Sequence, residues 1–140
     1  MITALSEKEC HSLLRGGRLA RLACVADGFP YVVPVNYVFD GESFIVHSMP
    51  GRKIEAMRAA PRVCLQVDDI ESHLRWKSVL ACGTYTEVRD AAERARALAC
   101  ILSVFPHLTP VETVIADDAN APSPVVFRVR VERVTGVKEG

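Results

Sequence analysis

The stretch YVVPVNYVFDGESFIVHSMPGRKIEAM, residues 31–57, decides how the rest of this chain is interpreted. It opens with an apolar strand interrupted by Pro34, and Asp40-Gly41 then turns the chain into a second apolar strand. That strand ends at His47-Ser48 and runs directly into a helix that begins at Gly51-Arg52-Lys53. This order of strand, turn, strand and helix start predicts a pocket with a cationic floor.

Arg52 and Lys53 lie at the N-terminal end of the predicted helix, and this end of a helix favours negative charge. The first N–H groups of a helix lack partners within it, and the macrodipole adds partial positive charge there. A phosphate would compensate, because it accepts from these N–H groups while the guanidinium binds it bidentately and the ammonium adds a point charge. Alternatively, Asp40, Glu42 or Glu55 supplies the countercharge, or water solvates both cations. The basic pair by itself favours this second explanation.

Pro34 has no N–H to donate to a strand ladder, so it predicts an edge strand or a bulge at this point. A flat heteroaromatic ring would stack on the strand there and hydrogen-bond to peptide groups around Val35 and Asn36. An edge proline that only blocks aggregation explains the residue equally well.

Upstream of this stretch the sequence predicts a short helix and a hairpin. Ser6 and Glu9 have the spacing of a capping box, and Gly16-Gly17 ends the helix. The turn signal Asp27-Gly28 then joins a strand over residues 18–26 to the strand from Tyr31 to Phe39. No catalytic residue is evident in this part of the chain.

Downstream, Pro61 ends the central helix and residues 62–67 alternate as a fourth strand. The acidic cluster after it is interpreted as solvent-exposed surface, not as a metal or acid–base site; it consists of Asp68, Asp69 and Glu71. A long strand follows over residues 74–88, with Trp76 and Ser78 on one face. Trp76 is interpreted either as an interface or cofactor-edge residue or as a partly buried barrel tryptophan.

The chain closes with a helix over residues 90–104, a proline-rich loop from Pro106 to Pro124 and a last strand over residues 125–135. Six mostly antiparallel strands joined by hairpins, with three helices at the periphery, indicate a mainly β protein built as a small barrel. The 140 residues are 49% hydrophobic and suit a single domain over residues 1–140.

Charge and cysteine content narrow the class of protein. Lys plus Arg and Asp plus Glu both number 17, so no broad basic field predicts binding of nucleic acid or an anionic membrane. The five cysteines are odd in number, lack a CxxC pair and fall mostly in apolar runs, so we expect reduced core residues in a cytosolic protein. The four histidines show no metal-binding spacing, and no segment is long and apolar enough to cross a bilayer. We expect a soluble, cytoplasmic protein without a metal.

Three segments of the sequence resemble a known family: residues 17–68, residues 76–88 (WKSVLACGTYTEV) and residues 125–136 (VVFRVRVERVTG). The chain is similar to the flavin-binding split-barrel proteins related to pyridoxamine 5′-phosphate oxidase. Within that group it resembles the short branch that contains the nitroimidazole-resistance proteins. The most specific matches are PYVVPVNYV, HSMPGRK, APRV and VERVTG.

The resemblance implies a six-stranded antiparallel split β-barrel that forms a homodimer with two composite FMN sites at the subunit interface. Arg52 and Lys53 match the pair that binds the phosphate of FMN. The other matches are Pro34, Val35 and Asn36 along the isoalloxazine, His47 and Ser48 beside the ribityl and phosphate groups, and Trp76 and Ser78 on the strand presented by the other subunit.

We therefore expect an FMN-binding flavoprotein that acts as an oxidoreductase on a small molecule. The alternatives are a non-catalytic flavin carrier or sensor, and a relative that binds haem or a deazaflavin. His47 is a candidate proton donor, because an imidazole titrates near neutral pH, although a histidine at a strand end also serves simply to hydrogen-bond the cofactor or a loop. The chain lacks the C-terminal extension with substrate-binding Arg and His residues of the true oxidases, so oxidation of vitamin B6 is not expected.

Overall fold

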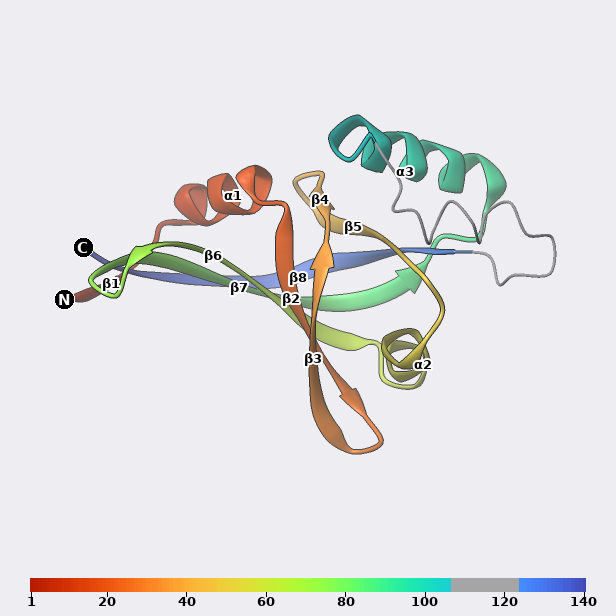
Figure 1. Ribbon diagram of the computed structural model, residues 1–140, viewed down its shortest axis with the longest axis horizontal. Coiled ribbons are helices and arrows are strands. Elements are labelled where there is room, and N and C mark those ends of the chain that lie inside the picture. The colour runs from red at the N-terminus through yellow and green to blue at the C-terminus, as the bar shows by residue number, and fades with distance from the viewer. Residues whose placement is uncertain (107–123) are drawn as a thin grey trace.

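The computed structural model describes residues 1–106 and 124–140 (Figure 1). These residues form eight strands and three helices. In chain order the elements are β1 (Ile2–Ala4), α1 (Glu7–Gly16), β2 (Leu19–Ala26), β3 (Phe29–Asn36), β4 (Val38–Phe39), β5 (Ser43–Ser48), α2 (Arg52–Ala59), β6 (Arg62–Ser72), β7 (Arg75–Glu87), α3 (Ala91–Val104) and β8 (Val125–Glu139). The predicted loop from Pro106 to Pro124 lies, except for these two end residues, outside the described part of the chain.

The strands of the described residues form one antiparallel sheet in the order β3-β2-β6-β7-β8-β5-β4, with β1 paired to β8. The two edge strands, β3 and β4, are separated along the chain only by Tyr37. Residues 29–36 pair with β2, whereas residues 38–39 pair with β5. One segment therefore joins both edges of the sheet, and the sheet curls into a split barrel.

This architecture confirms the predicted mainly β split barrel with helices at its periphery. The predicted number of six strands is wrong in two places. The short strand β1 has no counterpart in the prediction, and the predicted strand from Tyr31 to Phe39 is divided into β3 and β4. The division occurs because the segment changes its pairing partner at Tyr37.

Alternation along the strands builds the core on the inner face of the sheet. On β2, for example, every second residue from Ala20 to Ala26 is buried. Tyr37, Phe44 and Phe127 are among the largest buried side chains, and the rings of Tyr37 and Phe44 lie 5.0 Å apart. Burial of a side chain such as Phe44 stabilises the fold by roughly 1.5–3 kcal/mol. The Tyr37 hydroxyl also donates to the carbonyl of Leu14 at 2.7 Å and so ties α1 to the barrel.

The helices begin as the sequence predicts. The Ser6 hydroxyl accepts from the Glu9 N–H at 3.1 Å, and the Glu9 carboxylate accepts from the Ser6 N–H at 2.7 Å, which completes the capping box of α1. Helix α3 packs against a small second cluster that includes Ile45 and Val126. Helix α2 lies against β2, close to the β2–β3 hairpin that projects from the molecule (Figure 1). None of the helices in the described ranges has the length and apolar character needed to cross a bilayer.

Two of the five cysteines are bonded to each other. Cys64 on β6 and Cys82 on β7 are register partners whose Cα atoms lie 4.1 Å apart, and they form a disulfide. The prediction that all the cysteines are reduced is wrong for this pair. Both point to the outer face of the sheet, since their neighbours Val63 and Ala81 are buried in the core. Cys10, Cys24 and Cys100 are free.

Candidate functional site

The start of α2 is a helix terminus without a side-chain cap. Gly51 is the N-cap residue in extended conformation, and its carbonyl accepts the first helical bond, from the Glu55 N–H at 3.1 Å. No side chain hydrogen-bonds to the cap. A Cβ added at Gly51 would meet no atom within 4 Å, so there is open space beside the helix start. The N–H groups of residues 52–54 have no acceptor within the helix, and this end suits an anion.

Arg52 and Lys53 add two cations to this helix start. The Arg52 guanidinium lies over the ring of Tyr31 on β3, with its central carbon 5.2 Å from the ring centre. Lys53 is half-buried near Cys24 on β2. Burial lowers the pKa of the Lys53 ammonium below its usual value, and the Cys24 thiol partly opposes this effect. We refer to Tyr31, Gly51, Arg52 and Lys53 as the cationic cluster.

Two of the three carboxylates considered as countercharges for the cationic cluster pair with other arginines. Asp40 pairs with Arg128 at 2.9 Å, and Glu55 pairs with Arg58 at 3.4 Å. Within the described part of the chain, neither Arg52 nor Lys53 has a carboxylate within ion-pair distance. Of the alternatives left open by the sequence, a bound anion or solvated cations agree with this geometry.

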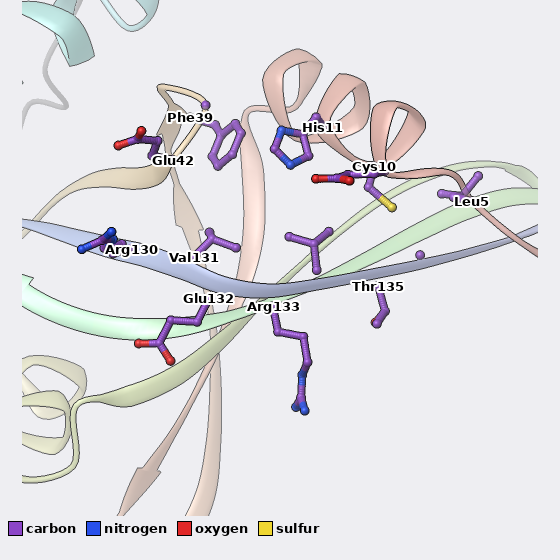
Figure 2. A pocket seen from close by; sticks show the side chains of 14 residues that line it. Leu5, Cys10, His11, Phe39, Glu42, Arg130, Val131, Glu132, Arg133 and Thr135 are labelled. Carbon is purple, nitrogen blue, oxygen red and sulfur yellow. The ribbon is translucent and has the colours of Figure 1, made fainter.

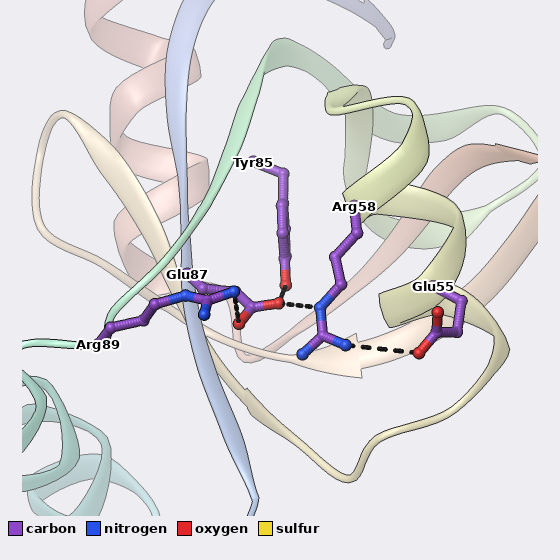
Figure 3. Close-up of polar contacts among 5 residues, drawn as sticks. All are labelled: Glu55, Arg58, Tyr85, Glu87 and Arg89. Atoms are coloured by element: carbon purple, nitrogen blue, oxygen red, sulfur yellow. Dashed lines mark hydrogen bonds and ion pairs between the residues drawn. The ribbon is translucent and has the colours of Figure 1, made fainter.

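A second charged group anchors α2 to the end of β7 (Figure 3). The Glu87 carboxylate accepts from the Tyr85 hydroxyl at 2.6 Å, binds Arg58 of α2 through its Nε, and pairs with Arg89 at 3.1 Å. The hydrogen bond from Arg58 is the main cause that lowers the pKa of Glu87, and burial is the main cause that raises the pKa of Tyr85. This cluster holds the helix whose first turn carries the cations.

The three predicted residues of β3 lie on two faces of an edge strand. Val35 is buried on the inner face, while Pro34 and Asn36 are exposed on the outer face. Pro34 pairs with Arg21 of β2 and leaves the other side of β3 without a strand partner at this point, as the edge prediction requires. The Asn36 amide donates to the carbonyl of Arg18 at 3.2 Å. An open strand edge therefore runs along the barrel from Tyr31 toward Asn36.

His47 and Ser48 are adjacent but face opposite ways. Ser48 is buried, and its hydroxyl donates to the carbonyl of Met49 at 3.1 Å. His47 is half-buried and shares its face of β5 with Ile45, which packs against α3. Only three residues separate His47 from Gly51, so this strand end leads directly into the cationic cluster.

Trp76 and Ser78 lie on the outer face of β7, on the positions that alternate with the buried Val79. Ser78 accepts from the Gln66 amide at 2.9 Å, and the same amide donates to Asp68 at 3.0 Å. Asp68 also pairs with Arg21 at 3.0 Å. The outer face of the sheet therefore carries four of the predicted site residues, Pro34, Asn36, Trp76 and Ser78, whereas Arg52 and Lys53 lie at the start of α2.

The sequence pattern did not identify Tyr31 or Glu87 as residues of the site. Tyr31 shares the inner face of β3 with Val35, four residues on, so the alternation that placed Val35 also carried the signal for Tyr31. Its contact with Arg52 depends on how α2 docks, which no local pattern shows. Glu87 is joined to Arg58 across 29 residues of chain, and its role was not visible in the sequence for the same reason.

A separate cavity of about 450 Å³ lies between α1, β4 and β8 (Figure 2). His11 and Phe39 meet there edge to face with ring centroids 5.8 Å apart, and Cys10 lies beside them. Burial raises the pKa of the Cys10 thiol, and the neighbouring carboxylates of Glu7 and Glu9 raise it further. The thiol is therefore held in its protonated form, which is a poor nucleophile.

Known proteins match this chain over most of its length. A family model described as pyridoxamine 5′-phosphate oxidase matches residues 6–138. The chain is 42% identical over 87 residues to an uncharacterized protein of Rhizobium meliloti (strain 1021). That match covers 62% of this chain and 58% of the relative, so the chain spans less than two thirds of that protein.

Solved structures share the fold as well. A FAD-binding protein from Mesorhizobium loti is 34% identical with a TM-score of 0.82, and the match covers 100% of this chain and 99% of that one. A FAD-binding protein from Mycobacterium smegmatis is 26% identical with a TM-score of 0.68, covering 96% and 97%. A candidate 5-nitroimidazole antibiotic resistance protein from Bacteroides thetaiotaomicron has the same fold, at 22% identity and a TM-score of 0.76, covering 99% and 87%.

Proposed function

This chain belongs to the pyridoxamine 5′-phosphate oxidase family, and from this membership and the cationic cluster we propose that it binds FMN. The observation that carries the proposal is the uncapped start of α2, where open space, helix N–H groups and two cations without carboxylate partners in the described residues meet. A phosphate is the part of a flavin nucleotide that this arrangement suits best.

The charge of the cationic cluster favours FMN over riboflavin and FAD. A phosphate monoester carries a charge of about −1.5 to −2 at neutral pH, which matches the two cations of Arg52 and Lys53. Riboflavin has no phosphate, and the corresponding phosphate of FAD is joined to a second phosphate by an anhydride bond and carries a single negative charge. The related proteins from M. loti and M. smegmatis are FAD-binding proteins, so FAD is the direct competitor. A bound dianion would also relieve the unfavourable half-buried position of the Lys53 ammonium.

We further propose that the protein is an oxidoreductase acting on a small molecule. FMN would supply hydride and electron transfer, and the chain would supply binding and orientation. The open edge of β3 offers peptide groups around Val35 and Asn36 to the edge of a flat ring. His47 would hold or release a proton at an imidazole nitrogen. We expect His47→Ala to retain FMN, because its side chain is not part of the cationic cluster, but to lose turnover near neutral pH.

We propose a homodimer in which each flavin site is composite. The outer face of the sheet exposes large apolar side chains, including Leu19, Val32, Leu80 and Val137 at 41–60% of their surface. Exposed apolar groups of this kind mark interfaces in many proteins. Trp76 and Ser78 share this face, so a second copy docked there would bring them to the flavin bound at Arg52 of its partner. In this arrangement Trp76 and Ser78 would contribute to the partner's site and not to that of their own chain.

Titration with three flavins tests the cofactor. FMN, riboflavin and FAD are added to the apoprotein, and the dissociation constant of each is measured by quenching of flavin fluorescence. We expect FMN to bind at least about tenfold more tightly than riboflavin, since a charge-assisted hydrogen bond contributes roughly 1.5–3 kcal/mol. Arg52→Ala should weaken FMN by a similar factor and leave riboflavin unchanged. Arg96→Ala, which removes an exposed arginine on α3, is the matched control.

Equal affinities for FMN and riboflavin would contradict a phosphate site at α2. Tighter binding of FAD than of FMN would move the assignment to FAD. Turnover of the FMN-loaded protein with NAD(P)H and an electron acceptor tests the enzymatic part separately. A protein that holds FMN tightly and shows no turnover with a panel of acceptors is a flavin carrier.

A further inference from the structure

Two side chains of the β2–β3 hairpin face the first turn of α2. Cys24 on β2 and Tyr31 on β3 are register partners on the inner face, where Cys24 is buried and Tyr31 packs against the core. The Arg52 guanidinium lies over the Tyr31 ring, and the Lys53 ammonium lies near the Cys24 thiol. This cross-strand pair therefore gives each cation of the cationic cluster one neighbour.

The turn of the hairpin fixes the position of this cross-strand pair. Asp27 and Gly28 form the turn at φ 52° and φ 78°, and residues 19–26 then pair with residues 29–36 without a shift in register. A slip of one residue would move the Tyr31 side chain to the outer face of the sheet, because side chains alternate along a strand. The ring therefore meets α2 because the turn sets the register.

Neither residue of the pair brings a negative charge to the cationic cluster. Burial is the main cause that raises the pKa of the Cys24 thiol, so this thiol is neutral near neutral pH. The Tyr31 ring offers a cation its π face. Since Arg52 and Lys53 also have no carboxylate within ion-pair distance among the described residues, both keep their charge for a ligand.

The contact with Tyr31 leaves the hydrogen-bond donors of Arg52 unused. The distance of 5.2 Å from the guanidinium carbon to the ring centre is inside the roughly 6 Å of a cation–π contact. A guanidinium donates in its own plane, so a ring over its face does not take up its N–H groups. Within the described part of the chain, no acceptor takes a hydrogen bond from Arg52. The side chain is thus restrained while its donors remain available.

We propose that Tyr31 is a positioning residue of the phosphate site, whose ring holds the Arg52 guanidinium ready for the phosphate without neutralising it. This inference rests on the proposed function, because the phosphate is that of the flavin nucleotide. A long side chain loses rotamer freedom when it binds a ligand, and a contact that already restrains Arg52 in the free protein removes part of this cost. Tyr31 acts through Arg52 and does not itself contact the phosphate.

The first measurement needs no flavin. In the isotope-labelled full chain at slightly acid pH, the Nε–H signal of Arg52 is assigned by its absence in Arg52→Ala. We expect the heteronuclear NOE of this signal to fall in Tyr31→Leu and to stay unchanged in Tyr31→Phe, which keeps the ring. Phe29→Leu is the matched control, because it removes an exposed ring from the same face of β3. Equal values in wild type and Tyr31→Leu would overturn the positioning role, whatever flavin the protein binds.

The second measurement isolates the contribution of the phosphate. The dissociation constants of riboflavin and FMN are measured for each variant, and their ratio reports the preference for FMN. We expect Tyr31→Leu to lower this ratio about two- to fivefold, the range of an exposed cation–π contact, and Tyr31→Phe and Phe29→Leu to leave it unchanged. In the Arg52→Ala background, Tyr31→Leu should lower the ratio no further.

Tyr31→Glu tests why an uncharged residue occupies this position. A carboxylate there would restrain Arg52 by an ion pair but neutralise it, so we expect a lower ratio than in Tyr31→Leu. A higher ratio in Tyr31→Glu than in Tyr31→Leu would refute the importance of the uncharged ring.

Three results of the titrations would contradict the role of Tyr31. Equal weakening of riboflavin and FMN in Tyr31→Leu would mean that the ring contacts the flavin itself and does not act through Arg52. A loss in Tyr31→Phe as large as in Tyr31→Leu would assign the effect to the hydroxyl. Equal affinities of the wild type for riboflavin and FMN would instead refute the phosphate site of the proposed function, and the role of Tyr31 would fall with it even if the NOE shows a restrained Arg52.

Discussion

Glu87→Gln is the most informative single change for the fold around the proposed site. The Glu87 side chain is only 11% exposed and binds Arg58 of α2, Arg89 and the Tyr85 hydroxyl. Glutamine has nearly the same shape and keeps one oxygen as an acceptor, but it removes the negative charge. The change therefore tests the charge of the cluster shown in Figure 3 and not its packing.

The expected loss is about 1.5 kcal/mol at pH 7. A hydrogen bond to a charged group contributes roughly 1.5–3 kcal/mol and a neutral one roughly 0.5–1.5 kcal/mol, so each charged bond that becomes neutral costs about 1 kcal/mol. Arg58 and Arg89 are 43% and 77% exposed, and solvent screening reduces their share. With an unfolding entropy of about 2.1 cal/mol/K for each residue, the 140-residue chain should lose about 5 °C in Tm.

The pH dependence has a defined sign. The hydrogen bond from Arg58 holds the pKa of Glu87 below its usual 4.5, so the charged carboxylate stabilises the fold above that pH. This contribution disappears as the pH falls through the lowered value. Thermal unfolding followed by circular dichroism should therefore show the full difference between wild type and Glu87→Gln at pH 7, and a smaller one at a pH well below 4.5.

Glu55→Gln is the matched control. Glu55 also pairs with Arg58, at 3.4 Å, but its side chain is 74% exposed. We expect a loss below about 0.5 kcal/mol for this variant. If Glu55→Gln and Glu87→Gln destabilise equally, or if the effect of Glu87→Gln is the same at both pH values, the argument from a buried charged cluster is wrong.

Three further changes test other parts of the structure. Gly83→Ala places a Cβ 1.9 Å from a backbone oxygen of β8 and should lower Tm by about 10 °C in a thermal scan, for a cost of about 3 kcal/mol, whereas Gly16→Ala meets nothing within 4 Å and should leave Tm nearly unchanged. Leu80→Glu should lower both the dimer content in sedimentation equilibrium and the FMN occupancy. Leu102→Glu, which changes an equally exposed residue on α3, should lower neither. A dimer that persists in Leu80→Glu would contradict the proposed interface. Tyr37→Phe leaves the Leu14 carbonyl without its donor and should cost about 1–2 kcal/mol of unfolding free energy. A Tm loss of less than about 2 °C in a thermal scan would show that this hydrogen bond contributes less than that.

Local chemistry in the sequence determined where most elements begin and end. The capping box at Ser6 and the turns at Asp27-Gly28 and Asp40-Gly41 are signals between residues close in the chain. The structure has Asp27 at φ 52°, Gly28 at φ 78° and Gly41 at φ 101°, a left-handed region that these residue types tolerate. The two cations Arg52 and Lys53 at the start of α2 could be identified from the sequence for the same reason, because the electrostatic effect of a helix end acts within one turn.

Tertiary structure alone decided which distant groups meet. The β6–β7 hairpin is symmetric about residue 73, and this register brings Cys64 opposite Cys82. The sequence pattern predicted a strand only over residues 62–67, so it did not predict how this strand pairs with the next one. The exchange of partners at Tyr37, the bulge beside Gly83 and the stacking of Arg52 on Tyr31 have the same origin. Strand pairing and helix docking depend on burial summed over the whole core, so residues separated by tens of positions become neighbours without any local signal.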